Sequence, residues 1–176
     1  MTTRIALLRG INVGGRNAVA MADLRGMLER LGCVDVRTYI QSGNAVFDAP
    51  DGVEVSASSI AAAVQALTGV DARVLVLTAA EFRRAAEHNP FAAEDGGTVQ
   101  LFFLESRPPD PDLDAIRELC RDSERWQLTH AVFYLHAPEG IARSKLAAAV
   151  ERKLGVSATA RNWRTVCKVL EMAETT

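Results

Sequence analysis

The sequence has few of the residues that mark secreted, metal-binding or membrane-spanning proteins. Its 176 residues include three cysteines, which form no Cys-x-x-Cys pair. This argues against a disulfide framework and against a zinc site. No apolar run has the length of a membrane span, and no charged leader followed by an apolar segment opens the chain. We therefore expect a cytoplasmic protein with small buried thiols, no metal and no membrane partner.

Aromatic residues and net charge are also low. Aromatic side chains make up 6% of the chain, and the formal net charge is −2. Sheets that bind RNA present exposed aromatic side chains and a Lys/Arg-Gly-Phe/Tyr-type segment, within a basic surface. Nucleic-acid binding is therefore a second hypothesis against which the composition counts. Hydrophobic residues at 48% and charged residues at 24% are typical of a globular protein with a real core.

Hydrophobic periodicity in the first half predicts the order β-α-β-β-α-β. Four strands are expected at residues 4–8, 34–40, 45–49 and 72–77. The first helix has Met21, Leu24 and Leu28 on one face. The second has Ile60, Val64 and Leu67 on one face, with Ser58 or Ser59 as its N-cap.

The second half repeats the same order. Strands are expected at residues 98–104, 125–129, 131–136 and 156–160, with a tail helix over 162–174. Asp110 and Pro111 suit the start of one helix, and Ser144 can cap another. Two such repeats predict an α+β fold, a tandem duplication of ferredoxin-like halves with antiparallel sheets. We expect a first half over 1–77, a short helix with a Thr78–Glu81 capping box and a connector over 78–97, and a second half over 98–176.

Unusual residues follow the first strand and separate the second and third strands. In a ferredoxin-like sheet these two loops lie at the same edge. The segment Arg-Gly-Ile-Asn-Val-Gly-Gly therefore lies beside Gln-Ser-Gly-Asn. The candidate ligand-binding residues at this edge are Arg9, Asn12, Gly14, Gly15, Gln41, Ser42 and Asn44.

Several interpretations of this edge stay open. Gly10 to Gly15 has the glycine spacing of a phosphate-binding loop, but Arg16 and Asn17 replace its Lys and Ser/Thr, which argues against nucleotide hydrolysis. The glycines suit a backbone anion site, or simply a tight turn hydrogen-bonded by Asn12. Gln-Ser-Gly-Asn is equally typical of an ordinary hairpin turn.

A second edge is expected in the second half, where two loops each precede a helix. Free N–H groups at helix starts favour anions. The candidates here are Ser144, Lys145, Arg161, Asn162 and Trp163. The alternatives are helix capping by Ser144, helix capping and pairing with an acid by Arg161 and Asn162, and packing by Trp163. Ser144 followed directly by Lys145 lacks the spacing of a Ser/Lys nucleophile pair.

The motifs carry a resemblance to a known family. The segments ALLRGINVGGRNAVAMADLR, VRTYIQSGNAVF, NPF, SKL and ATARNWRTVCKVLEM occur in this order. In this respect the chain resembles the bacterial domain-of-unknown-function 1697 family across essentially its whole length. The resemblance implies an α/β fold built from two ferredoxin-like halves, and no reaction.

The sequence thus predicts a protein that binds a small phosphate- or carboxylate-bearing ligand. If both edges line one cleft, Arg and Lys would clamp the anion while Asn and Gln orient the remainder. No residue qualifies as a general base, and neither a cofactor nor an enzymatic reaction can be assigned. A protein-interaction module, such as a homodimer formed through a sheet edge or the tail helix around Trp163, is the third hypothesis.

Overall fold

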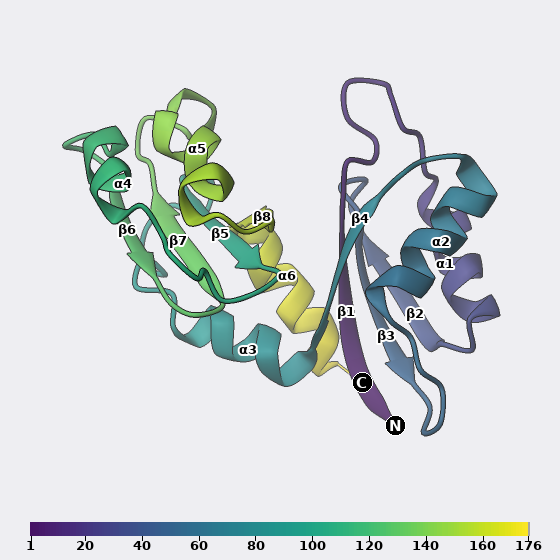
Figure 1. Ribbon diagram of the computed structural model, residues 1–176. Helices are drawn as coiled ribbons and strands as arrows, with labels where there is room; N and C mark the ends of the chain where they lie inside the picture. The colour runs from purple at the N-terminus through teal and green to yellow at the C-terminus, as the bar shows by residue number, and fades with distance from the viewer. Residues whose placement is uncertain (176) are drawn as a thin grey trace. The chain divides into compact units, whose positions relative to one another are not determined.

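The computed structural model describes residues 1–175, which form two compact units. Unit 1 comprises Met1–Arg84 together with the chain from Lys168 onward. Unit 2 comprises Ala85–Cys167. Each unit contains a four-stranded antiparallel sheet with helices on one face (Figure 1). None of the helices within residues 1–175 is long and apolar enough to cross a membrane.

The sheet of unit 1 has the strand order β2-β3-β1-β4. Its strands are β1 (Thr2–Arg9), β2 (Val34–Tyr39), β3 (Asn44–Ala49) and β4 (Arg73–Thr78). Helices α1 (Met21–Arg30) and α2 (Ala57–Thr68) cover one face (Figure 1). Alternation along β1 sends Ala6 and Leu8 into the core beneath these helices. Arg9 consequently lies on the opposite face, with Ile5 and Leu7.

Two expectations about α2 are wrong. Its N-cap is Ser56, whose Oγ accepts from the Ser59 backbone N–H at 3.1 Å, while Ser59 Oγ accepts from the Ser56 N–H at 3.0 Å. The helix therefore begins earlier than expected, because Ser59 serves as the reciprocal partner of the cap. Leu67 is 49% exposed, since it lies in the last turn at the rim of a shallow groove with Met27 and Ala63.

Unit 2 repeats this connectivity, with strand order β6-β7-β5-β8. Its strands are β5 (Val99–Leu104), β6 (Arg125–Leu128), β7 (Val132–His136) and β8 (Ala158–Asn162). Helices α4 (Leu113–Leu119) and α5 (Lys145–Leu154) pack on one face, and a short 3-10 turn η1 (Ile141–Arg143) precedes α5. The two sheets confirm the predicted pair of β-α-β-β-α-β repeats. The start of α4 differs from expectation, since Asp112 is its N-cap and accepts from the Ala115 N–H at 3.1 Å.

Two further helices, α3 (Ala79–Glu87) and α6 (Trp163–Glu174), contain the boundaries between the units. The predicted capping box at the start of α3 is present, with Thr78 N–H donating to Glu81 Oε2 at 2.8 Å and Glu81 N–H donating to Thr78 Oγ1 at 3.1 Å. The expectation of three buried thiols is wrong. Cys33 is buried and Cys120 half-buried, but Cys167 is exposed, because it lies on the outer face of α6 next to the buried Val166.

Candidate functional site

The loop after β1 folds back on itself as a small hairpin. Asn12 N–H donates to Asn17 O at 2.9 Å, and Arg16 N–H donates to Val13 O at 3.0 Å. Gly14 and Gly15, with φ of 56° and 75°, form the tip of this turn. A turn with two left-handed central residues requires glycine or asparagine. The tip is exposed and extends beyond the end of the sheet, which gives the two glycines a turn-forming role (Figure 1).

Asn12 joins this loop to the β2–β3 turn. Its Nδ2 donates to Val19 O and to Gln41 O, both at 2.8 Å, and its Oδ1 accepts from Val19 N–H at 2.9 Å. The structure thus brings the two loops together at one sheet edge, as the topology predicts. The Asn12 amide is used for this connection, which makes Asn12 a positioning residue at the edge.

Asn44 and Gly43 shape the β2–β3 turn from within. Asn44 is fully buried, and its Nδ2 donates to Tyr39 O at 2.9 Å and to Ser42 Oγ at 3.1 Å. Gly43 has φ of 83°, and a Cβ there would lie only 2.6 Å from Ile11 Cδ1. The turn can approach the first loop this closely because Gly43 has no side chain. Gln41 and Ser42 remain exposed beside it.

Arg9, the last residue of β1, has a charged neighbour that the sequence analysis missed. Its register partner on β4 is Arg73, so two arginines stand directly opposite each other. Ser42 extends the row on the other side, because β1 and β3 pair Leu7 with Asn44, and Leu8 N–H donates to Gly43 O at 2.8 Å. We call Ser42, Arg9 and Arg73 the arginine row. Arg73 was missed because it lies beyond the loops from which the candidates were chosen.

The second predicted edge has mainly helix-capping roles in the structure. Ser144 is 4% exposed, and its Oγ accepts from the Ala147 N–H at 3.0 Å as the N-cap of α5. Asn162 Oδ1 accepts from the Thr165 N–H at 2.8 Å in the first turn of α6. Lys145 is exposed at the start of α5. The hydroxyl of Ser144 and the amide oxygen of Asn162 therefore stabilise helix starts, as the capping alternative expects.

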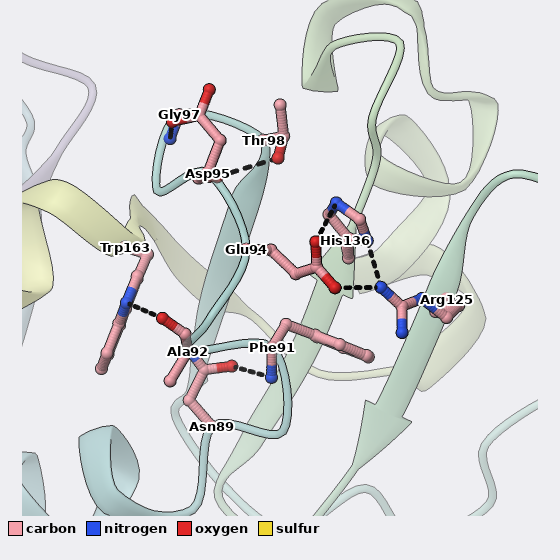
Figure 2. Close-up of polar contacts among 10 residues, drawn as sticks. All are labelled: Asn89, Phe91, Ala92, Glu94, Asp95, Gly97, Thr98, Arg125, His136 and Trp163. Carbon is pink, nitrogen blue, oxygen red and sulfur yellow. Dashed lines mark hydrogen bonds and ion pairs between the residues drawn. The ribbon is translucent and has the colours of Figure 1, made fainter.

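The sequence analysis placed Arg161 in a loop before the last helix. In the structure it lies inside β8. The last strand runs to Asn162, because Leu101 and Gln100 of β5 pair with Arg161 and Asn162. Arg161 is 8% exposed, and burial lowers the pKa of its guanidinium to about 10. Its NH1 donates to Ala160 O at 2.8 Å. Trp163 Nε1 donates to Ala92 O at 3.3 Å, which attaches α6 to the connector (Figure 2).

A polar cluster that the sequence analysis did not find fastens the connector to the sheet of unit 2 (Figure 2). The Arg125 guanidinium donates to Glu94 Oε1 at 2.5 Å and to His136 Nδ1 at 3.0 Å, and lies 5.3 Å from the Phe91 ring centre. Hydrogen bonding and charge from Arg125 hold the pKa of the Glu94 carboxyl below its usual range. The Asn-Pro-Phe motif was a signal for this cluster, since Asn89 Oδ1 accepts from the Phe91 N–H at 3.0 Å.

The cluster of Arg125, Glu94 and His136 attaches the connector to the sheet and is not arranged as a reaction centre. His136 is 6% exposed, and it accepts a hydrogen bond from a permanently charged guanidinium. Within residues 1–175, no three His, Cys, Asp or Glu side chains are grouped as metal ligands. At the loop edge of unit 1, strand register places the guanidinium of Arg9 and the hydroxyl of Ser42 at neighbouring positions on one sheet face.

The fold and these edges define a two-unit α+β protein in which each unit has the β-α-β-β-α-β connectivity. The chain belongs to the family described as "Protein of unknown function (DUF1697)", which it matches over residues 1–134. That range includes the loop edge of unit 1, and it ends before the last helices and the Arg161–Trp163 motif.

A solved structure has the same architecture over nearly the whole chain. The conserved bacterial protein SP0830 from Streptococcus pneumoniae is 25% identical, with a TM-score of 0.71, and the similarity covers 98% of each chain. No curated protein matches the chain.

Proposed function

We propose that this protein binds a small molecule bearing a phosphate or carboxylate group at the loop edge of unit 1. The observation that carries the proposal is the direct contact between the two loops, Asn12 Nδ2 to Gln41 O at 2.8 Å, at the end of the strand that presents Arg9. A guanidinium binds a carboxylate or phosphate through two parallel hydrogen bonds. The half-buried position of Arg9 strengthens such bonds by limiting solvent around them.

The division of roles within the edge follows from the contacts. Asn12 and Asn44 use their amides on backbone carbonyl groups, so they fix the shape of the loops. Arg9, Gln41 and Ser42 would contact the ligand, while Gly14 and Gly15 form the neighbouring loop tip. Ser144, Lys145, Arg161, Asn162 and Trp163 stay a prediction for a second anion-binding edge in unit 2, a role separate from their contacts described above.

A thermal-shift screen of the purified full chain tests the proposal. The probes are inorganic phosphate, nucleotides, sugar phosphates and organic acids. A ligand at 100 times its dissociation constant should stabilise the folded protein by about 2.7 kcal/mol. We expect Arg9→Gln to abolish the shift with little change in the melting temperature of the unliganded protein.

Arg164→Gln is the matched control, because Arg164 is exposed in unit 2 and pairs with Asp95 at 2.5 Å. The control should retain the full ligand-induced shift. A screen without any hit, or a hit that Arg9→Gln leaves unchanged, would refute binding at this edge.

A further inference from the structure

Strand β4 forms one edge of the unit 1 sheet, and part of its backbone is unpaired (Figure 1). Leu8 N–H donates to Gly43 O at 2.8 Å, so the backbone of Leu8 is turned towards β3 and away from β4. Its register partner on β4 is Val74, and opposite residues of an antiparallel pair either exchange hydrogen bonds or both point away. The N–H and C=O groups of Val74 therefore point away from β1, as do those of Val76 by alternation. Within residues 1–175, no strand pairs with these groups and no loop backbone bonds to them.

The equivalent edge of unit 2 has its outward backbone groups occupied. Strand β8 takes the place of β4 in the second strand order. Ala158 N–H donates to Glu151 Oε1 at 2.9 Å, and Arg161 NH1 donates to Ala160 O at 2.8 Å. Two charged side chains thus bond to backbone groups that a further strand would need, which protects the edge. The two repeats differ at this edge, although they share the same connectivity.

The edges formed by β2 and β6 have features that hinder strand pairing. The register of β2 shifts between Val34 and Arg37, and β6 has four residues and begins at the exposed Arg125. Bulges, short strands and charged residues are common ways to protect an edge. In contrast, β4 pairs with β1 without a register shift, and its central residues Val74–Leu77 are uncharged and half-buried. Among the sheet edges of the described residues, β4 is therefore the one suited to pairing.

We infer that β4 pairs antiparallel with β4 of a second copy of this chain, which joins two unit 1 sheets into one continuous sheet. The twofold axis passes between Leu75 and the partner's Leu75, so Val74 lies opposite the partner's Val76. Such an interface is closed, because both copies use the same strand. It is built from β4 and includes none of the side chains assigned to contact the anionic ligand.

Hydrogen bonding selects this register. Each pair of Val74 with the partner's Val76 exchanges two N–H···O=C bonds, so four bonds use the outward groups of both residues in both copies. Thr78 N–H already donates to Glu81 Oε2 at 2.8 Å. A register with Val74 opposite the partner's Thr78 would therefore leave the Val74 C=O groups without a donor.

The side chains of β4 favour a second copy as the occupant. Cross-strand pairs of β-branched residues, such as Val74 with the partner's Val76, stabilise paired strands. The two Arg73 side chains would be about 14 Å apart along the strands, beyond the screening length of about 8 Å at physiological salt. The net charge of −2 adds little repulsion between two copies. A segment of another protein would meet no charged side chain between Val74 and Leu77 that could select it.

Sedimentation equilibrium of the full chain tests the inference, together with a proline substitution at the edge. We expect the average mass to rise from one chain to two between low-micromolar and near-millimolar concentration. Val76→Pro removes an outward N–H and leaves the ladder with β1 in place, because proline is tolerated where an edge strand faces away from its neighbour. Two of the four bonds between the copies are lost, so the dissociation constant of the dimer should rise at least about tenfold.

Ala160→Pro is the matched control. Ala160 takes the position of Val76 on the occupied edge of unit 2, so the variant should dimerise like the unmodified chain. Circular dichroism checks that both variants fold.

Amide hydrogen exchange of the unmodified chain, followed by NMR, is a second test that needs no substitution. When about nine in ten chains are dimeric, exchange at Val74 and Val76 should be about tenfold slower than in the monomer, because these amides exchange from the monomer. Thr78 is the internal control, since its N–H is bonded to Glu81 with or without a partner.

A mass of one chain at every concentration would overturn the inference and leave the β4 edge to an extended segment of another protein. A dimer whose Val74 and Val76 amides exchange as fast as in the monomer would also overturn it, since another surface would then be the interface. The same holds if a folded Val76→Pro variant dimerises as tightly as the unmodified chain. None of these results bears on the anion site, which the thermal-shift screen tests separately.

Discussion

Single asparagines hold the loop after β1 in a conformation that most residues avoid. Asn12 and Asn17 have φ of 51° and 56°, and each bonds to backbone carbonyl groups with its side chain. Asparagine tolerates the left-handed region better than most residues, and its amide can satisfy loop backbone groups. The two asparagines differ in the number of groups to which their side chains bond. Asn12 bonds to Val19 and Gln41, whereas Asn17 donates to Gly10 O.

This difference predicts unequal effects of the same substitution. Asn12→Gly removes hydrogen bonds to Val19 O, Gln41 O and Val19 N–H, whereas Asn17→Gly removes the bond to Gly10 O. Glycine accepts the positive φ at both positions, and its effect on the unfolded chain is the same in both variants. At about 0.5–1.5 kcal/mol per bond, the two additional bonds lost in Asn12→Gly should cost about 1–3 kcal/mol more in free energy of unfolding. Urea denaturation measures the difference, and equal losses would contradict it.

For single residues, the sequence predicted which loops meet but not the group to which each side chain bonds. The spacing of Arg9, Asn12 and Gln41 in a known topology was enough to predict that their loops meet. It could not tell whether an amide would bond to its own backbone or point at a ligand, because both uses favour the same residue. Arg73 became visible only through strand register, which depends on how β4 pairs with β1.

Helices begin at two capping boxes in unit 1, and the sequence revealed one of them. Thr78 and Glu81 have the Thr-x-x-Glu pattern that predicts reciprocal capping. The box of Ser56 and Ser59 lies in a serine-rich segment, where several residues could serve as the cap. The existence of each helix followed from periodicity at α2 and from the capping box at α3. The exact start of α2 did not, since competing hydroxyl groups in the segment offer similar hydrogen bonds.

The capping box of α3 gives a pH dependence to stability. Hydrogen bonds from the Thr78 backbone N–H and hydroxyl lower the pKa of Glu81 below the usual 4.5. A lowered folded-state pKa stabilises the protein above the unfolded value, and this stabilisation is lost as pH falls below about 4.5 towards the folded value. Glu81→Gln should therefore reduce stability at pH 7 by about 0.5–1 kcal/mol and have a smaller effect near pH 3.

Melting temperatures measured from pH 7 to pH 3 test this expectation. Glu54→Gln makes the same change of charge at an exposed position outside the helices and serves as the control. An effect of Glu81→Gln that is constant with pH would mean that the carboxylate charge contributes nothing to the cap.

At the scale of the whole molecule, the two repeats read from the sequence do not coincide fully with the compact units. Periodicity assigns the tail helix to the second half, because it follows the last strand directly. Contacts instead assign its residues from Lys168 onward to unit 1, together with the N-terminal strands. Arg83 Nε, at the end of the first stretch of unit 1, donates to Glu174 Oε1 at 3.0 Å. Such long-range packing is absent from local sequence patterns.

We expect the end of α6 to stabilise the protein through its buried face and not through the ion pair of Arg83 with Glu174. Val169 is fully buried, so Val169→Ala should cost about 1–3 kcal/mol in free energy of unfolding, even though alanine favours helix. Arg83 and Glu174 are each nearly half exposed, so Glu174→Gln should cost less than about 0.5 kcal/mol. Urea denaturation followed by circular dichroism compares the two variants. If Glu174→Gln proved as costly as Val169→Ala, the helix end would be held by charge and its stability would fall with added salt.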